Sequence, residues 1–151
     1  MNPVELTLFA SRLNAVCDEM GGVLRRAAFS TNIRDRLDFS CAIFDAAGDL
    51  CAQAAHIPVH LGSMAYAMRD VVARIAWLPG DQVVLNDPYL GGTHLPDVTL
   101  IAPVYVDDRL AGFPELLDRR GDALQLAESA ADEAAEFEVD NLDAVVVFRK
   151  L

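Results

Sequence analysis

The stretch FSCAIFDAAGDLCAQAA, residues 39–55, alternates between two kinds of side chain with a period of two on either side of a short break. This period is typical of β-strands, because successive side chains of a strand point to opposite faces of a sheet. The break at Ala46, Ala47 and Gly48 is a turn in which glycine is free to adopt a positive φ angle. The stretch therefore predicts a β-hairpin.

On both sides of this hairpin the apolar residues recur every three or four positions, as in helices with one buried face. Residues 3 to about 28 predict a long helix, which Gly21 and Gly22 weaken because glycine costs about 1 kcal/mol in a helix interior. Residues from about 64 to 76 predict a second helix, with Ser63 as its N-cap. The charged segment NIRDRLD, residues 32–38, indicates a surface loop or the rim of a site.

Strand patterns return after the second helix. QVVLN, residues 82–86, predicts a buried strand, and VTLIAPVYV, residues 98–106, predicts another that turns at Asp107 and Asp108 into RLAGF. We therefore expect an α+β fold, in which an N-terminal helix, β-hairpins and a second helix pack on a mixed sheet.

The character of the sequence changes after residue 113. Residues 114–151 hold ten acidic and four basic residues, a net charge of −6, and the middle of this segment is rich in alanine and glutamate. Such a segment predicts a solvated helix or a frayed tail, with AVVVF, residues 144–148, as a closing strand. We expect two parts, residues 1–113 and a divergent acidic tail at 114–151.

Composition excludes several classes of protein. The chain has 12 basic and 23 acidic residues among 151, a formal net charge of −11, and Lys150 is its only lysine. A nucleic-acid partner is not expected, because phosphate binding needs a basic patch. No apolar run reaches the length of a membrane span, so we expect no membrane association and a cytoplasmic location. Cys17, Cys41 and Cys51 are expected to be reduced core residues.

The loop NDPYLGGTHLPD, residues 86–97, carries the candidate chemistry. His94 and Asp97 form a mixed imidazole and carboxylate ligand set, which suits Mn, Fe, Zn or Ni. Gly91 and Gly92 allow the backbone to approach a ligand closely. The loop contains Asn86, Asp87 and Pro88, a pattern that also begins an ordinary turn, so a structured turn pair is an equal alternative to a ligand-binding loop.

The other two histidines, His56 and His60, flank the segment IPV. In an extended chain four residues span about 13 Å at about 3.3 Å each, so both could not easily bind one ion. One of them is expected to line the same pocket as His94. The alternative is that both donate to backbone carbonyls and hold a loop.

Two long stretches, residues 12–64 and residues 79–105, resemble the N-terminal part of the hydantoinase B/oxoprolinase family. The first begins RLNAVCDEMGG and ends HIPVHLGSM, and the second is PGDQVVLNDPYLGGTHLPDVTLIAPVY. The likeness extends from about Pro3 to Phe113. The family includes ATP-dependent oxoprolinases, N-methylhydantoinases and subunits of acetone and acetophenone carboxylases.

This resemblance implies a division of labour. A hydantoinase A-like partner subunit would bind ATP and phosphorylate a small-molecule substrate, and the B-like part would complete the hydrolysis of a cyclic amide or the carboxylation of a ketone. It implies a divalent metal (Mn, Zn or Fe) held by His94 and Asp97 of the THLPD motif and by a later histidine. Asp87, His56 and His60 would be pocket residues, and Gly91 and Gly92 would shape the pocket beside the ligand.

The sequence departs from the family after Gly112 and Phe113. Members of the family are several times longer and continue into a segment with adjacent histidines, near where this chain has Arg119 and Arg120. An arginine cannot replace a neutral imidazole ligand. We therefore expect an incomplete metal site and a chain truncated relative to the family.

Three alternative interpretations of the whole chain follow. In the first, it is a truncated or frame-disrupted fragment with little activity alone. In the second, it is a small subunit that completes a split enzyme, and in the third, it is a non-catalytic interaction domain.

Overall fold

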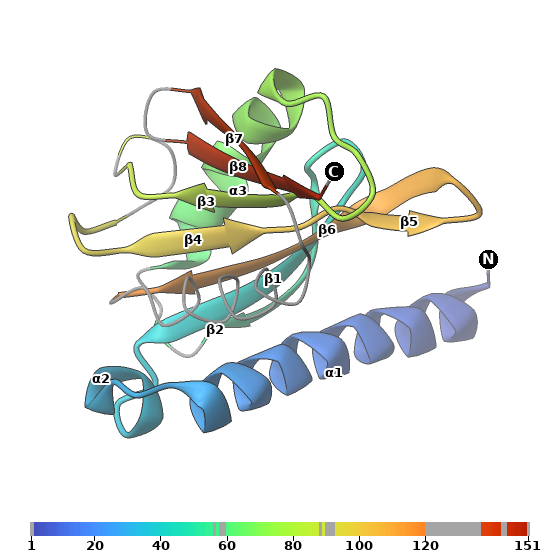
Figure 1. The fold of residues 1–151 in the computed structure, drawn as a ribbon. Helices are drawn as coiled ribbons and strands as arrows, with labels where there is room; N and C mark the ends of the chain where they lie inside the picture. The colour runs from blue at the N-terminus through green and yellow to red at the C-terminus, as the bar shows by residue number, and fades with distance from the viewer. Residues whose placement is uncertain are drawn as a thin grey trace.

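A computed structural model of the chain describes residues 2–55, 57, 60–87, 89, 93–119, 137–142 and 145–150. It has one eight-stranded sheet with a long helix along one face and a second helix against the other (Figure 1). The helices are α1 (Pro3–Ala27), α2 (Thr31–Arg34) and α3 (His60–Arg74). The strands are β1 (Phe39–Asp45), β2 (Leu50–Ala55), β3 (Gln82–Leu85), β4 (Val98–Ile101), β5 (Val104–Val106), β6 (Arg109–Asp118), β7 (Phe137–Leu142) and β8 (Val145–Lys150).

Helix α1 confirms the long N-terminal helix. It begins with a capping box, in which the Asn2 side chain accepts from the Glu5 amide at 2.9 Å and the Glu5 carboxylate accepts from the Asn2 amide at 2.9 Å. Two first-turn amides are thereby satisfied. The helix continues through Gly21 and Gly22 to Ala27, so the predicted weak point does not interrupt it.

The hairpin predicted for residues 39–55 is confirmed as β1 and β2. Gly48 has a φ angle of +82° in the turn, and a Cβ atom there would lie 3.1 Å from the Cα of Arg69 in α3. Glycine is therefore required both for the backbone conformation and for the close approach of α3. The Asp45 carboxylate accepts from the amides of Ala47 and Asp49, both at 2.9 Å, and closes the turn.

The second predicted hairpin is also confirmed, with an interruption. Strands β4 and β5 both pair with β6, and Pro103, which has no N–H to donate, lies between them. Asp107 and Asp108 form the turn in the left-handed region, with φ angles of 49° and 58°.

The α+β class is confirmed, although every strand pairing in the described residues is antiparallel and the expected mixed sheet is wrong in this respect. The strand order is β2-β1-β6-β4-β3-β8-β7, with β5 beside β6. Strands β2 and β3, which α3 connects, are separated by three strands, so they do not form the parallel pair that a helical connection often makes.

Two hydrophobic cores fix the layers. On one face, Met64, Met68 and Val71 of α3 pack on Phe44 and Phe113. On the other face, Cys17 and Leu24 of α1 pack on Phe39 and Cys41. Burial of these side chains from both sides sets the order of helix, sheet and helix.

Several local predictions need correction. Helix α3 begins at His60 and not near Met64, and the Ser63 hydroxyl donates to the His60 carbonyl at 3.3 Å instead of capping the helix. Helix α2 overlaps the start of the segment 32–38, which was predicted as a loop or rim. Cys51 is exposed, whereas Cys17 and Cys41 are buried as expected.

The C-terminal segment holds one confirmed and one unexpected strand. Strand β8 is the predicted closing strand, and it pairs with β3. Strand β7 was not predicted, since its first residues lie in the segment that we expected to be a solvated helix or tail. The alanine and glutamate-rich residues 120–136 lie outside the described residues. No helix in the described part of the chain has the length and apolarity to cross a membrane.

Candidate metal centre

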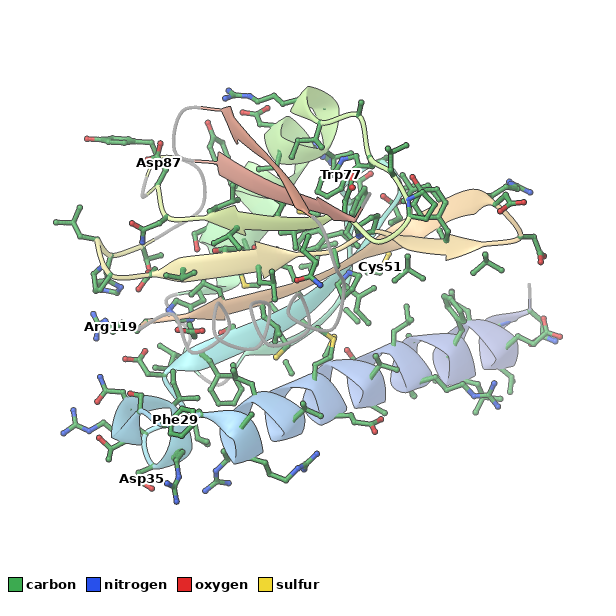
Figure 2. All side chains as sticks on the ribbon, viewed as in Figure 1. Phe29, Asp35, Cys51, Trp77, Asp87 and Arg119 are labelled. Atoms are coloured by element: carbon green, nitrogen blue, oxygen red, sulfur yellow. The ribbon has the colours of Figure 1, made fainter. Side chains whose placement is uncertain are left out.

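The ends of several elements meet at one end of the sheet. Helix α3 begins there with His60, β1 is preceded there by Asp38, and the loop that follows β3 returns there through His94 and Asp97 to start β4. Figure 2 labels Asp87 and Arg119 at this end, on the left of the view. Residues far apart in sequence are thus brought together on the α3 side of the sheet.

His60 is fully buried, and one of its ring nitrogens has a fixed partner. Its Nδ1 lies 3.0 Å from the Ser40 hydroxyl oxygen. Its Nε2 is buried and has no hydrogen-bond partner among the described residues. Burial lowers the pKa of His60 below 6.5, although the carboxylates of Asp97 and Asp38 act in the opposite direction. A neutral imidazole with a free nitrogen is the form that binds a metal ion.

Asp97 is buried, and only one of its carboxylate oxygens is used. Its Oδ2 accepts from the Thr93 amide at 2.9 Å, the Thr93 hydroxyl at 2.8 Å and the His94 amide at 2.8 Å. Burial alone raises the pKa of Asp97, but these hydrogen bonds outweigh it, so the pKa lies below 3.8. Its Oδ1 is buried without a hydrogen-bond partner in the described part of the chain.

His94 lies next to this carboxylate and is partly exposed. Its Nδ1 is 3.0 Å from the Thr93 hydroxyl oxygen and 3.3 Å from Asp97 Oδ2. The Asn86 side chain donates to the carbonyls of Leu95 and Asp97 and so ties the loop to the end of β3.

His60, His94 and Asp97 fit the requirements of a divalent metal site. Each offers one ligand atom, and these three atoms lie within 4.8 Å of one another. Atoms that each bind one ion at about 2.1 Å are at most about 4.2 Å apart, so shifts of roughly 1 Å would bring all three into coordinating range. His60 Nε2 and Asp97 Oδ1 are buried polar atoms without partners, which is costly unless another group binds there.

The structure places the other predicted site residues as follows. It brings His60, which we expected only to line the pocket, together with His94 and Asp97. Asp87 is partly buried, and its carboxylate accepts from the Tyr89 amide at 2.8 Å, which is a local turn contact. His56, Gly91 and Gly92 lie outside the described residues.

The structure also reveals neighbours that sequence reasoning missed. Ser40 and Thr93 hold His60 and Asp97, and the only sequence signal was a polar residue between Phe39 and Cys41 for Ser40 and the position next to His94 for Thr93. Arg119, near which the resemblance led us to expect a histidine, approaches the Asp38 carboxylate at 3.4 Å. It forms part of the polar surroundings of His60, whose pKa it helps to lower.

Sequence comparison and structure comparison both find known proteins that are similar to this chain. The chain is 48% identical over 117 residues to the 5-oxoprolinase PfmaA of Pestalotiopsis fici, which is 75% of this chain and 9% of that protein. The nucleotide-free structure of acetone carboxylase has a TM-score of 0.70 at 22% identity over 78% of this chain and 16% of its own. The ATP-dependent caprolactamase of Pseudomonas jessenii has a TM-score of 0.67 at 25% identity over 80% of this chain and 21% of its own.

The chain thus spans about a fifth or less of the length of these proteins. Residues 2–116 match the sequence profile of hydantoinase B/oxoprolinase. This match covers most of the chain and includes all three residues of the candidate metal centre. The chain belongs to the hydantoinase B/oxoprolinase family.

Proposed function

We propose that this chain supplies a divalent-metal site to an ATP-dependent hydrolase of cyclic amides, of the hydantoinase and oxoprolinase type. The carrying observation is the convergence of His60, His94 and Asp97, with ligand atoms within 4.8 Å of one another. The kinship to a 5-oxoprolinase at 48% identity supports the reaction class. The activity of the whole enzyme is part of this proposal, because the chain spans only a small share of that relative.

Hydrogen bonds within this chain would orient two of the ligand residues before a metal ion binds. The Ser40 hydroxyl fixes Nδ1 of His60 and leaves Nε2 available. Thr93 and the His94 amide occupy Oδ2 of Asp97 and leave Oδ1 available. Mn, Zn or Fe suits this set of two imidazoles and one carboxylate. When bound, such an ion would polarise a carbonyl oxygen of the substrate as a Lewis acid.

The proposal includes a partner that binds ATP. The sequence has no GxxxxGK[ST] phosphate loop, and its single lysine is Lys150. We infer that a hydantoinase A-like subunit or domain binds ATP and activates the substrate carbonyl. Residues 1–113 would form the part that resembles the family and contributes the metal site, and the acidic segment 114–151 is assigned no catalytic role.

Ketone carboxylation has weaker support than amide hydrolysis. The likeness to acetone carboxylase, at 22% identity, is a likeness of fold. The oxoprolinase relative has about twice that identity. A non-catalytic interaction domain is the remaining alternative, and it does not account for the two unpartnered buried atoms at the site.

Metal binding is the first test. Mn²⁺ titration of the full chain, followed by electron paramagnetic resonance and calorimetry, should show one saturable site. His60→Ala, His94→Ala and Asp97→Ala should each weaken binding at least tenfold. Asp70→Asn, which removes a carboxylate from the exposed side of α3, is the matched control and should bind as the wild type does. Equal affinity in all five proteins would contradict the proposal and favour the interaction domain.

The reaction class needs a second experiment. The chain should be combined with a hydantoinase A-like protein, and ATP-dependent ring opening should be followed with 5-oxoproline, hydantoin and caprolactam. Copurification and hydrolysis that is lost in His94→Ala would support the proposal. If the chain binds metal but no cyclic amide is hydrolysed, the proposed metal site stands and the proposed reaction is wrong.

A further inference from the structure

A second polar site lies where the end of α1 meets α2. An open hollow of about 570 Å³ is lined by Gly22, Arg25, Arg26, Arg34 and Asp35. Asp35, directly after α2, is labelled at the lower left of Figure 2. No residue of this lining belongs to the candidate metal centre, so the hollow lies outside the site on which the proposed function rests.

Gly22 makes room for the hollow. A Cβ atom at this position would lie 3.3 Å from a terminal nitrogen of the Arg26 guanidinium, so the arginine rests on the surface that a side chain would otherwise cover. Glycine costs about 1 kcal/mol in a helix interior compared with alanine. A side chain at position 22 would therefore shift the Arg26 guanidinium by a few tenths of an ångström.

The three arginines of the lining are exposed at the surface. Arg25 donates from Nε to the Arg34 carbonyl at 2.8 Å, which braces α1 against α2. Among the described residues, no ion pair joins any of the three to an acidic side chain. Asp35 is the one acidic residue in the lining, so the hollow retains two net positive charges.

This concentration of positive charge is unusual for the chain. Four of its 12 basic residues, Arg25, Arg26, Arg34 and Arg36, fall within residues 25–36, while the whole chain has a net charge of −11. Cations in the last turn of a helix also interact favourably with its dipole. Arg25 and Arg26 lie in the last turn of α1 and Arg34 in the last turn of α2, so this effect does not by itself explain why arginines of two helices line one hollow.

We propose that this hollow binds the phosphate groups of a small polyphosphate ligand, such as inorganic pyrophosphate or a nucleoside di- or triphosphate. Guanidinium groups present paired donors that match phosphate oxygens. Two net positive charges complement a dianionic group, and the open mouth of the hollow leaves room for the rest of a nucleotide. A long nucleic acid is a poor match, because the remainder of this acidic chain would repel it.

Calorimetric titration of the full chain with pyrophosphate and with ATP tests the proposal. EDTA is present throughout, so the result does not depend on the metal centre. We expect one saturable site whose affinity falls at high salt. Arg26→Gln and Arg34→Gln should each weaken binding at least fivefold. Arg74→Gln and Arg109→Gln remove the same charge elsewhere and should leave the affinity unchanged.

The variant Gly22→Ala tests whether ligand binding changes while the stability of the fold is kept. The added methyl group should shift the Arg26 guanidinium by a few tenths of an ångström and slightly weaken pyrophosphate binding, while the melting temperature stays the same or rises because alanine favours the helix. Malonate, a small dicarboxylate, should bind more weakly than pyrophosphate.

Three outcomes would overturn the proposal. One is no saturable binding of pyrophosphate or ATP at 10 mM ligand. Another is an equal loss in the control variants, which would show diffuse charge attraction. The last is malonate binding as tight as pyrophosphate binding, which would assign the hollow to carboxylates such as those of an acidic peptide.

Discussion

The Nδ1 atom of His60 lies 3.0 Å from the Ser40 hydroxyl oxygen, and this contact links the first residue of α3 to β1. The two residues are twenty positions apart and both are fully buried. The contact sets the orientation of the imidazole, and the free Nε2 is one of the three ligand atoms in the candidate metal centre. A partner on the second ring nitrogen of a histidine commonly tunes metal binding.

Ser40→Ala should therefore weaken Mn²⁺ binding by about tenfold or more, because the imidazole loses the contact that orients it. The fold should lose only about 1 kcal/mol of unfolding free energy, the typical worth of one hydrogen bond. Ser63→Ala is the matched control, since that hydroxyl contacts the His60 carbonyl and not the ring. If both variants bind Mn²⁺ like the wild type, Ser40 does not position the ligand.

Asn86→Asp should loosen the loop that carries His94 and Asp97. The Asn86 side chain donates to the carbonyls of Leu95 and Asp97, and a carboxylate would face those oxygens without a proton to share. We expect weaker Mn²⁺ binding by roughly tenfold and a small loss of thermal stability. Asn14→Asp makes the same change on the exposed side of α1 and should have no effect on binding.

Glu115→Gln should alter the pH dependence of stability. Complete burial raises the pKa of Glu115 to about 8 from an ordinary value of 4.5. Between these two values the folded chain keeps a proton that the unfolded chain has released, so the free energy of unfolding falls as the pH rises. The glutamine variant cannot ionise and should melt at a higher temperature than the wild type at pH 8.

Thermal melts of Glu115→Gln between pH 5 and pH 8.5 measure this effect. The exposed Glu19→Gln is the control and should follow the wild type at every pH. A wild-type slope that persists unchanged in Glu115→Gln would assign the pH dependence to another group.

Gly112→Ala should disrupt the contact between β1 and β6. A Cβ atom at this position would lie 2.3 Å from the Phe44 carbonyl oxygen, which belongs to the backbone of the paired strand and cannot rotate away. We expect a loss of about 3 kcal/mol or more, or failure to fold. In Gly62→Ala the new Cβ meets nothing within 4 Å, and the helix should gain up to about 1 kcal/mol. Urea denaturation of both variants provides the comparison.

The elements that sequence reasoning predicted well depend on local patterns. The period of two at residues 39–55 and the turn at Gly48 specify the first hairpin, because adjacent strands pair through a short turn whatever surrounds them. The capped helix α1 likewise follows from its apolar spacing. Strand β7 was missed because its first residues continue a stretch rich in alanine and glutamate, and its place depends on pairing with β8.

The candidate metal centre likewise combines two residues that the sequence pattern selected with one whose role it did not predict. Sequence reasoning selected His94 and Asp97, but it treated the segment from His56 to His60 as extended and so gave His60 only a lining role. In the structure His60 is the first residue of α3, and packing of that helix on the sheet carries the imidazole to Ser40, His94 and Asp97.

The sequence by itself determined the α+β class, both hairpins, the long helix and the loop that holds two of the three candidate ligands. Spacing and turn residues act over a few positions, so their consequences can be read locally. Only the tertiary structure decided which distant strands are neighbours, which face α3 covers and which histidine joins the site. Those outcomes depend on burial shared among segments far apart in the chain, and no local pattern encodes that burial.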